Sequence, residues 1–285
     1  LWKQSGHWDN YRDNMYVLEE DDYTMKPMNC CGHCLIFNNE TRSYKDMPIR
    51  YADFGNLHRN ETSGSLRGLT RVRKFSQDDA HIFCRIDQIK QEICGCLELL
   101  QKIYKMFNLS CEFYISTRPT KSLGKEDDWE KATQNLIEAL EESEIRYDVN
   151  DKDGAFYGPK IDIIVKDSLD RSHQCGTIQL DFQLPEKFDL SYIKEDGSKE
   201  RPVIVHRAIF GSVERFMAIL LEHTQGNLPV FISPRQVKII PINSKVEGYA
   251  KNVQKQIKKT YSESKYAKMQ ITFFERVSKT SLAVL

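Results

Sequence analysis

Hydrophobic and polar residues alternate most clearly between residues 69 and 84. If this segment is one extended strand, successive side chains point to opposite faces of a sheet. One face then carries Leu69, Arg71, Arg73, Phe75, Gln77, Asp79, His81 and Phe83. A sheet face with this many charged, amide and imidazole groups is costly to bury unless a ligand or an ion satisfies them. The pattern therefore predicts the floor of a polar binding site.

A second period in the hydrophobic pattern, close to that of an α-helix, predicts helices between short strands. Apolar residues recur at helical spacing over Ile86–Phe107, and Trp129–Ser143 gives a second amphipathic helix. A further helix opens at Gly211–Ser212. Strand-like segments lie at 49–61, 161–165, 177–182 and 203–205. Because strands often follow one another without a helix between them, we predict an α+β fold, with an antiparallel sheet flanked by helices.

A short stretch from Pro229 to Pro234 has the composition of a linker. It predicts two domains, 1–228 and 229–285, which suits a chain of 285 residues. After the linker, 237–242 reads as a strand and 246–261 as a helix rich in lysine. This order predicts a partial α/β domain at the C-terminal end.

The composition is that of an ordinary globular protein, with 40% hydrophobic and 29% charged residues. Basic and acidic residues balance at 41 each, so any basic surface must be local. No apolar run approaches the length that spans a membrane. Eight cysteines in a chain too large to need disulfides predict a reduced, cytoplasmic setting, with an organellar copy as an open alternative. The chain opens at Leu1 rather than methionine, which we interpret as a fragment.

Several strings resemble those of class II aminoacyl-tRNA synthetases. Residues 58–61 (HRNE) with 71–75 (RVRKF) resemble motif 2, and 211–215 (GSVER) resembles motif 3. Others resemble threonyl-tRNA synthetases in particular: LWKQSGHWDNY, MKPMNC, QDDAHIFC, GAFYGPKID, HQCGTIQLDF and RPVIVHRAI. The resemblance implies a catalytic core over 1–228, with most of motif 1 before Leu1, and the start of an anticodon-binding domain over 229–285.

The resemblance implies a role for each polar residue around ATP. Arg59 would hold the α-phosphate and the amino-acid carboxylate, and Glu61 would bind the adenine amino group. Phe75 would stack on the adenine, while Arg71 and Arg215 would hold the triphosphate. These residues suit the reaction, because activating a carboxylate on ATP depends mainly on positioning and charge neutralisation.

Two glutamines complete the implied reaction site. Gln77 and Gln174 would surround the reacting groups, with Mg²⁺ bridging the phosphates, and Arg59, Arg215 and Gln77 are the expected catalytic residues. Taken alone, an arginine is typical of a surface ion pair and a phenylalanine of a core. Their combination on one strand face favours the site.

The resemblance also implies one zinc ion per chain. Threonyl-tRNA synthetases bind Zn²⁺ through a cysteine and two histidines that match Cys30, His81 and His206. Three protein ligands leave the open position of a working zinc site. The sequence spacing alone announces no metal, and a buried cysteine with hydrogen-bonded core histidines is the ordinary alternative.

Zinc would solve a discrimination problem in this family. Threonine and valine are nearly isosteric, and a site that binds a hydroxyl rejects the analogue that lacks it. The ion would take the amino and hydroxyl groups of threonine, with Asp79 accepting from the hydroxyl. Tyr157, Lys160 and Gln179 are the further residues that the resemblance places in the threonine pocket.

One position departs from the family string Met-Asn-Cys-Pro-Gly-His. Residues 28–33 place Cys31 where proline is expected, which adds a thiol beside Cys30. Cys31 and Cys34 also have CxxC spacing, a rival metal or redox motif. We favour Cys30 as the zinc ligand, because two thiols without further partners make a poor zinc site.

The implied protein is a homodimeric threonine–tRNA ligase with ATP, L-threonine and tRNA(Thr) as partners. A second interpretation is another subclass IIa synthetase, for serine or proline. A third is a catalytically silent, synthetase-like protein that binds RNA or regulates. The lysines of 251–259 could contact RNA phosphates, and their ordinary role is a solvated helix face.

Overall fold

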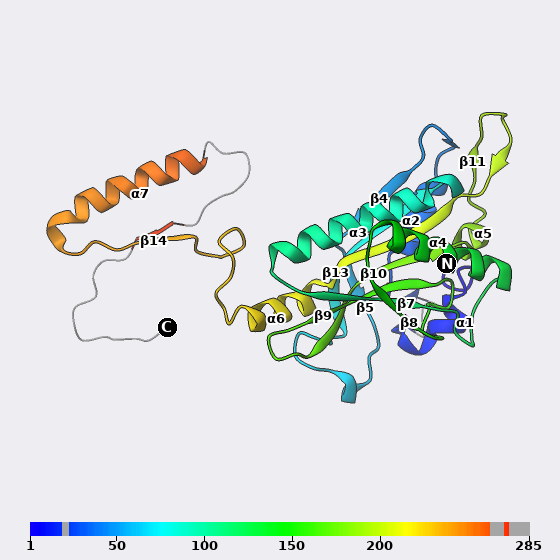
Figure 1. The fold of residues 1–285 in the computed structure, drawn as a ribbon, viewed down its shortest axis with the longest axis horizontal. Helices are drawn as coiled ribbons and strands as arrows, with labels where there is room; N and C mark the ends of the chain where they lie inside the picture. Colours follow the sequence, from blue (N-terminus) through cyan, green and yellow to red (C-terminus); the bar gives the residue numbers. More distant parts are fainter. Residues whose placement is uncertain (19–22, 263–270, 274–285) are drawn as a thin grey trace. The chain divides into compact units, whose positions relative to one another are not determined.

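The computed structural model describes residues 1–18, 23–262 and 271–273 (Figure 1). The chain forms two compact units, 1–223 and 224–285. Part of the predicted 229–285 domain lies outside the described residues. The assignment of the units as a catalytic and an anticodon-binding domain stays a prediction, and each unit is described by itself.

The first unit is built on an eight-stranded sheet. Its strands follow the order β4 (Ile49–Asp53), β6 (Lys74–Cys84), β13 (Val203–Ser212), β10 (Ser172–Asp181), β9 (Lys160–Lys166), β7 (Cys111–Ser116) and β8 (Tyr147–Asn150), and β5 (Asn56–His58) also pairs with β6. Neighbouring strands are antiparallel apart from β7 and β8, which are parallel. The predicted α+β fold with an antiparallel sheet is confirmed.

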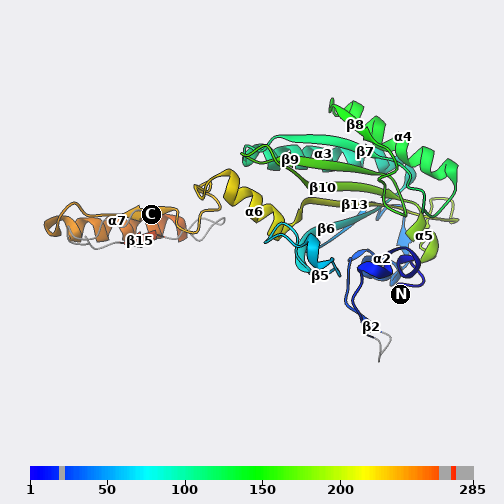
Figure 2. The same cartoon turned by 90° about the horizontal axis from the view of Figure 1, so that it is seen from below.

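Helices α3 (Ile89–Met106) and α4 (Glu126–Glu142) cover one face of this sheet (Figure 2). Most of the apolar stripe predicted over Ile86–Phe107 is buried, since Ile89, Ile93, Leu97, Leu100 and Tyr104 are each at most 1% exposed, but Ile86 precedes α3 and is 59% exposed. The predicted helical period therefore identified the side of α3 that packs on the sheet.

The N-terminal segment and two short helices lie against the opposite face (Figure 2). The N-terminal segment contains α1 (His7–Tyr11), and the two short helices are α2 (Cys30–Asn38) and α5 (Gln183–Lys187). Phe37 of α2 stacks on Phe83 of β6 with 4.6 Å between ring centroids. This second core anchors α2 beside the polar side chains of β6.

The remaining elements of the first unit are short. They are β1 (Val17–Leu18), β2 (Tyr23–Thr24), β3 (Arg42–Ser43), β11 (Tyr192–Ile193), β12 (Lys199–Glu200), α6 (Val213–His223), and the 3-10 turns η1 (Arg12–Asn14), η2 (Ser63–Ser65) and η3 (Ile86–Gln88). Strands β12, β11 and β3 form a small sheet of their own.

The strand predicted from residue 69 is wrong at its start. Strand β6 begins at Lys74, because the chain before it turns back on itself. The Arg67 N–H donates to the Arg71 carbonyl and the Thr70 N–H donates to the Arg67 carbonyl, at 3.1 and 2.9 Å. Arg71 therefore belongs to a turn and not to the strand face that carries Phe75.

Strand β13 is longer than the predicted 203–205. It runs to Ser212, with an irregular register between Ala208 and Ser212 where it pairs with β6. The buried Asp78 carboxylate accepts the backbone N–H groups of Ile209 and Phe210 there, at 2.7 and 3.0 Å. A side chain of β6 thus satisfies backbone groups that the irregular pairing frees.

The second unit contains β14 (Val237–Ile239), parallel to β15 (Ile271–Phe273), the turn η4 (Ser244–Val246) and helix α7 (Glu247–Ser262). Asn243 begins the turn by accepting backbone N–H groups of Lys245 and Val246. Lys251 pairs with Glu247 one turn earlier, at 2.5 Å. Over the described residues, none of the helices has the length and apolarity needed to cross a membrane.

Candidate active site and metal ligands

Five side chains form a row across the sheet, on the face that meets α2. The register pairs Tyr51 with His81, His81 with His206, His206 with Gln179, and Gln179 with Lys160. Directly opposite residues on an antiparallel sheet have neighbouring side chains. The register therefore gathers residues from positions 51 to 206 into one line.

Helix α2 and its N-cap residue supply polar partners for the side chains of β6 in and beside this row. The Asn29 amide donates to the Asp79 carboxylate at 3.0 Å, and His33 Nδ1 lies 2.7 Å from His81 Nδ1. Burial raises the pKa of Asp79, an effect opposed by His206, Asn29 and Arg59. Burial, with two neighbouring imidazoles, lowers the pKa of His81 well below its ordinary value. A lowered pKa favours the neutral form of His81, and neutral imidazole is the form that binds metals.

A hydrogen-bonded pocket forms the other end of the row. The Tyr157 hydroxyl donates to the Gln179 side chain, and its ring stacks on His206 with centroids 5.0 Å apart. Lys160 pairs with the buried Asp162 at 2.8 Å, and the Gln174 amide donates to the same carboxylate at 2.5 Å. These predicted residues therefore form two hydrogen-bonded groups, Tyr157 with Gln179 and Lys160 with Gln174 through Asp162, and the register places Gln179 opposite Lys160.

Three guanidinium groups gather beyond this pocket. Burial is the largest cause that lowers the pKa of Arg215, and the positive charges of Arg71 and Arg59 lower it further. Arg215 donates to the carbonyls of Thr70 and Gln174 at 2.8 and 2.7 Å. Arginines held this close suit an anion with several charges, such as a triphosphate.

The predicted adenine residues lie beside these arginines. The Arg59 guanidinium lies over the Phe75 ring, 5.0 Å from its centroid. Glu61 accepts from Arg71 Nη2 at 2.9 Å, and the Arg71 side chain is half exposed. Gln77 pairs with Ser212 in the register, so it lies next to the start of α6, which carries Arg215.

The two predicted histidine ligands are adjacent and buried. The His81 and His206 rings lie 4.6 Å apart, and their residues are 2% and 6% exposed. The fully buried Asp181 carboxylate lies 2.9 Å from His206 Nε2. A carboxylate on one ring nitrogen orients the other toward a metal, as in many zinc sites. Nδ1 is then the nitrogen of His206 that can bind an ion.

Cys30 lies 3.9 Å from a histidine that the sequence analysis did not select, His7. Among the described residues, the group of three potential ligand atoms that lie within 4.8 Å of one another is His7, Cys30 and Cys31. Cys34 is outside that group, and all eight cysteines are free thiols. A hydrogen bond between the adjacent thiols raises the pKa of Cys30 and lowers that of Cys31. The structure therefore does not bring Cys30, His81 and His206 within this limit.

Four residues of the site were missed by the sequence analysis. They are Asn29, His33, Asp162 and Asp181, which contact predicted residues rather than standing in for them. A signal existed for Asp162, because it lies two positions after Lys160 and so shares its strand face. The others become evident only once the strands are paired.

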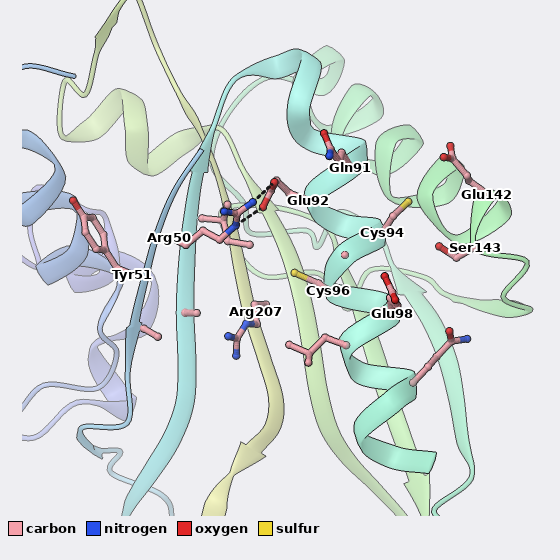
Figure 3. A pocket seen from close by; sticks show the side chains of 16 residues that line it. Arg50, Tyr51, Gln91, Glu92, Cys94, Cys96, Glu98, Glu142, Ser143 and Arg207 are labelled. Carbon is pink, nitrogen blue, oxygen red and sulfur yellow. Dashed lines mark hydrogen bonds and ion pairs between the residues drawn. The ribbon is translucent and has the colours of Figure 1, made fainter. Parts of the chain in front are cut away.

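A cavity of about 780 Å³ lies on the opposite face of the sheet, beside α3 (Figure 3). Its two arginines are already paired: Arg50 donates two hydrogen bonds to Glu92, at 2.8 and 2.7 Å, and Arg207 lies 3.6 Å from Asp78. Of the five residues in the row described above, Tyr51 lies at the edge of this cavity, and His81, His206, Gln179 and Lys160 do not line it.

Comparison with known families agrees with this architecture. The family described as tRNA synthetase class II core domain (G, H, P, S and T) matches residues 16–224. The chain belongs to the class II tRNA synthetases, in their threonyl branch. Its relatives include a threonyl-tRNA synthetase structure from Cryptosporidium parvum Iowa II, titled as the RNA binding domain, at 45% identity and a TM-score of 0.85. That match covers 96% of this chain and 74% of the other.

Curated relatives in this branch come from different compartments. Threonine–tRNA ligase, mitochondrial 1, of Arabidopsis thaliana is 56% identical over 90% of this chain and 37% of its own length. Threonine–tRNA ligase 2, cytoplasmic, of Mus musculus is 54% identical over 90% and 33%. The chain thus spans about two fifths or less of the length of these class II relatives.

Proposed function

We propose that this class II synthetase core belongs to a threonine–tRNA ligase. The whole protein would activate threonine with ATP to threonyl-adenylate and transfer it to the 3′-terminal ribose of tRNA(Thr). The observation that carries the proposal is the continuity of one surface. The row from His81 to Lys160 joins, through Gln174, the group of arginines that contains Arg215. An amino acid and a triphosphate would thereby meet on neighbouring strands.

The arginines supply the electrostatic part of the reaction. Attack of a carboxylate on the α-phosphate gathers negative charge, and preorganised donors lower the barrier without needing to reorganise. Arg59 would hold the α-phosphate and the threonine carboxylate, and Arg71 and Arg215 the rest of the triphosphate. Mg²⁺ with ATP would neutralise further phosphate charge.

Binding ATP would require one ion pair to open. Glu61 now accepts from Arg71, whereas the proposal assigns Glu61 to the adenine amino group and Arg71 to phosphate. An ion pair with a half-exposed partner is worth only about 0–1 kcal/mol. The loss of this ion pair is small compared with the two contacts that would replace it, from Glu61 to the adenine and from Arg71 to phosphate. The pair is therefore compatible with a nucleotide-free form of the proposed site. Phe75 would offer its ring to the adenine, and Gln77 would lie beside the reacting groups.

The proposed zinc ligands fit the ion in chemical type. Thiol and imidazole are donors that Zn²⁺ binds, three protein ligands leave a position open, and Asp181 supplies the outer-sphere carboxylate. Held by Cys30, His81 and His206, Zn²⁺ would bind the amino and hydroxyl groups of threonine and so reject valine. Asp79, fixed by Asn29, would accept a hydrogen bond from the hydroxyl.

The pocket residues would enclose the substrate. Tyr157 and Gln179 hold each other beside His206, and Lys160 is held by Asp162. These contacts fix the side chains before the substrate arrives, which reduces the cost of ordering them on binding. We extend the proposal to a homodimer that acts in the cytoplasm, with an organellar form as the alternative.

Threonine-dependent ATP–pyrophosphate exchange, with zinc content determined on the same sample, tests the proposal. We expect one zinc ion per chain, and exchange with threonine well above that with valine or proline. Cys30→Ser should release the zinc and lower exchange by more than the about 10–100-fold typical of outer-sphere partners. Cys34→Ser, a buried thiol on the same helix, is the matched control and should retain both.

Two results would count against the proposal. Full exchange by a zinc-free preparation would remove the proposed role of the metal. Absence of exchange with any amino acid, from a protein that still binds RNA, would favour the silent RNA-binding alternative.

A further inference from the structure

A cluster of potential metal ligands lies where α1 meets the start of α2. His7, Cys30 and Cys31 are 0%, 2% and 0% exposed, and one ligand atom from each lies within 4.8 Å of the other two. His7 Nε2 is 3.9 Å from the Cys30 sulfur, and His7 Nδ1 is 4.0 Å from the Cys31 sulfur. Two thiols and an imidazole thus converge in a buried space.

The separation between His7 Nε2 and the Cys30 sulfur is close to that of two ligands on one ion. Zinc–sulfur and zinc–nitrogen bonds are about 2.3 and 2.0 Å, so a nitrogen and a sulfur on one tetrahedral ion lie about 3.5 Å apart. The observed 3.9 Å between His7 and Cys30 exceeds that by only a few tenths of an ångström.

The neighbours of His7 complete a soft donor set. The Met28 sulfur lies 3.2 Å from His7 Nε2, and the Ser5 hydroxyl lies 2.8 Å from Nδ1. A hydrogen bond at Nδ1 leaves Nε2 to bind a metal, which is the usual outer-sphere arrangement. Thiolate and thioether sulfur select thiophilic cations such as Zn²⁺ and Cu⁺.

We propose that His7, Cys30 and Cys31 form a second cation site, which takes a thiophilic ion such as Zn²⁺, Cd²⁺ or Cu⁺. Both cysteines would bind the ion as thiolates, and any thiol proton still present would be released to solvent. The site needs no synthetase activity. Only one consequence rests on the proposed function: Cys30 would be shared with the zinc site of His81 and His206, so one ion would occupy either position and not both.

Cys31 is what makes the second site possible. Proline is expected at this position from the resemblance, and proline has no metal ligand. Cys31 lies in the first turn of α2, where the N–H groups have no acceptor within the helix and proline is tolerated. The helix therefore does not require a cysteine here, and Cys31→Pro is a substitution that removes the thiol with little cost to the fold.

Cadmium titration of the metal-free protein tests the site, because the ultraviolet thiolate-to-cadmium absorption scales with the number of bound thiolates. The variants are Cys31→Pro, Cys31→Ser and the double variant His81→Ala with His206→Ala, with Cys34→Ser as the control. Circular dichroism monitors folding in each variant. We expect two thiolates per ion in the wild type and in the Cys34→Ser control.

The variants separate the second site from the proposed zinc site. Both Cys31 variants should lose half of the absorption per ion, and the double histidine variant should keep it. A wild-type signal of one thiolate per ion would overturn the proposal, as would a double histidine variant that binds no cadmium. Threonine-dependent exchange by the wild type is measured separately, so failure of the proposed function is seen independently of this signal.

Discussion

Asp162 connects several parts of the proposed active site, and its replacement by asparagine should weaken both stability and activity. The carboxylate is 3% exposed and receives three side-chain donors, from Ser116 at 2.6 Å, Gln174 at 2.5 Å and Lys160 at 2.8 Å. An asparagine of the same shape offers one oxygen and an NH₂ group. At least one of the three donors would then face another donor.

The magnitude follows from the contacts that would be lost. A hydrogen bond to a charged group contributes about 1.5–3 kcal/mol, and a buried donor left without an acceptor adds about 1–3 kcal/mol. Lys160 keeps a second partner, since Asp153 lies 3.3 Å away, which limits the loss. We expect Asp162→Asn to lower the free energy of unfolding by about 3 kcal/mol, or the melting temperature by about 6–12 °C.

Activity should fall as well, because Gln174 carries the effect to an arginine. The Gln174 side chain is held by Asp162, and its carbonyl accepts from Arg215 at 2.7 Å. A misplacement of about 1 Å near reacting groups can cost about 100-fold in rate. We expect kcat for exchange to fall by up to about 100-fold, with the KM for ATP also raised.

Calorimetry and exchange kinetics on two variants decide the point. Asp153→Asn is the matched control, because it removes the exposed partner of the same lysine, an interaction worth about 0–1 kcal/mol. If Asp162→Asn melts within 2 °C of Asp153→Asn, a margin of about 1 kcal/mol or less, the network does not stabilise the site and the reasoning is refuted.

Three further predictions follow from other parts of the first unit. Gly158→Ala should lower the free energy of unfolding by about 3–5 kcal/mol in denaturant titration, because its Cβ would lie 2.0 Å from the Leu180 carbonyl oxygen. The control is Gly64→Ala, whose Cβ would meet nothing within 4 Å, so its unfolding free energy should stay within about 0.5 kcal/mol of the wild type. Burial raises the pKa of Asp78 from 3.8 to about 6, so its contribution to stability is full below pH 3.8 and is lost as the pH rises through 6. The difference in unfolding free energy between wild type and Asp78→Asn should therefore change by about 3 kcal/mol between pH 4 and 7, and an unchanged difference would contradict the raised pKa. Serine differs from threonine by one methyl group, which contributes about 1–3 kcal/mol of discrimination, so serine-dependent exchange should be detectable at about 10–200-fold lower kcat/KM. Complete absence of serine-dependent exchange would argue against the proposed pocket.

Alternation along one strand could predict part of the site, because strand period is local. Phe75, Gln77, Asp79 and His81 lie in β6, and the side-chain contacts of Asp79 and His81 with α2 are on the predicted face. Arg71 was placed on that face wrongly, since a turn ends the period before Lys74. A local pattern is reliable only as far as its element extends.

Pairing between strands could not be derived from the residues themselves. His206 is opposite His81, and a slip of one residue would turn it to the other face of the sheet. The register depends on the packing of the whole sheet, and only family strings indicated that these histidines belong together. His7 is harder still, because nothing in its sequence spacing links it to Cys30 or Cys31.

The irregular end of β13 shows how the two faces of the sheet depend on each other. Asp78 points away from the proposed site, yet its carboxylate holds the backbone of Ile209 and Phe210. The chain then passes Gly211, whose φ of +72° and 2.3 Å Cβ clearance from the Cys175 carbonyl oxygen admit only glycine. This local path brings Ser212 opposite Gln77. Helix α6 then starts at Val213, so Arg215 lies in its first turn, next to the proposed site. A buried carboxylate on one face of the sheet therefore helps to fix the backbone that leads to Arg215, an arginine of the proposed site on the other face.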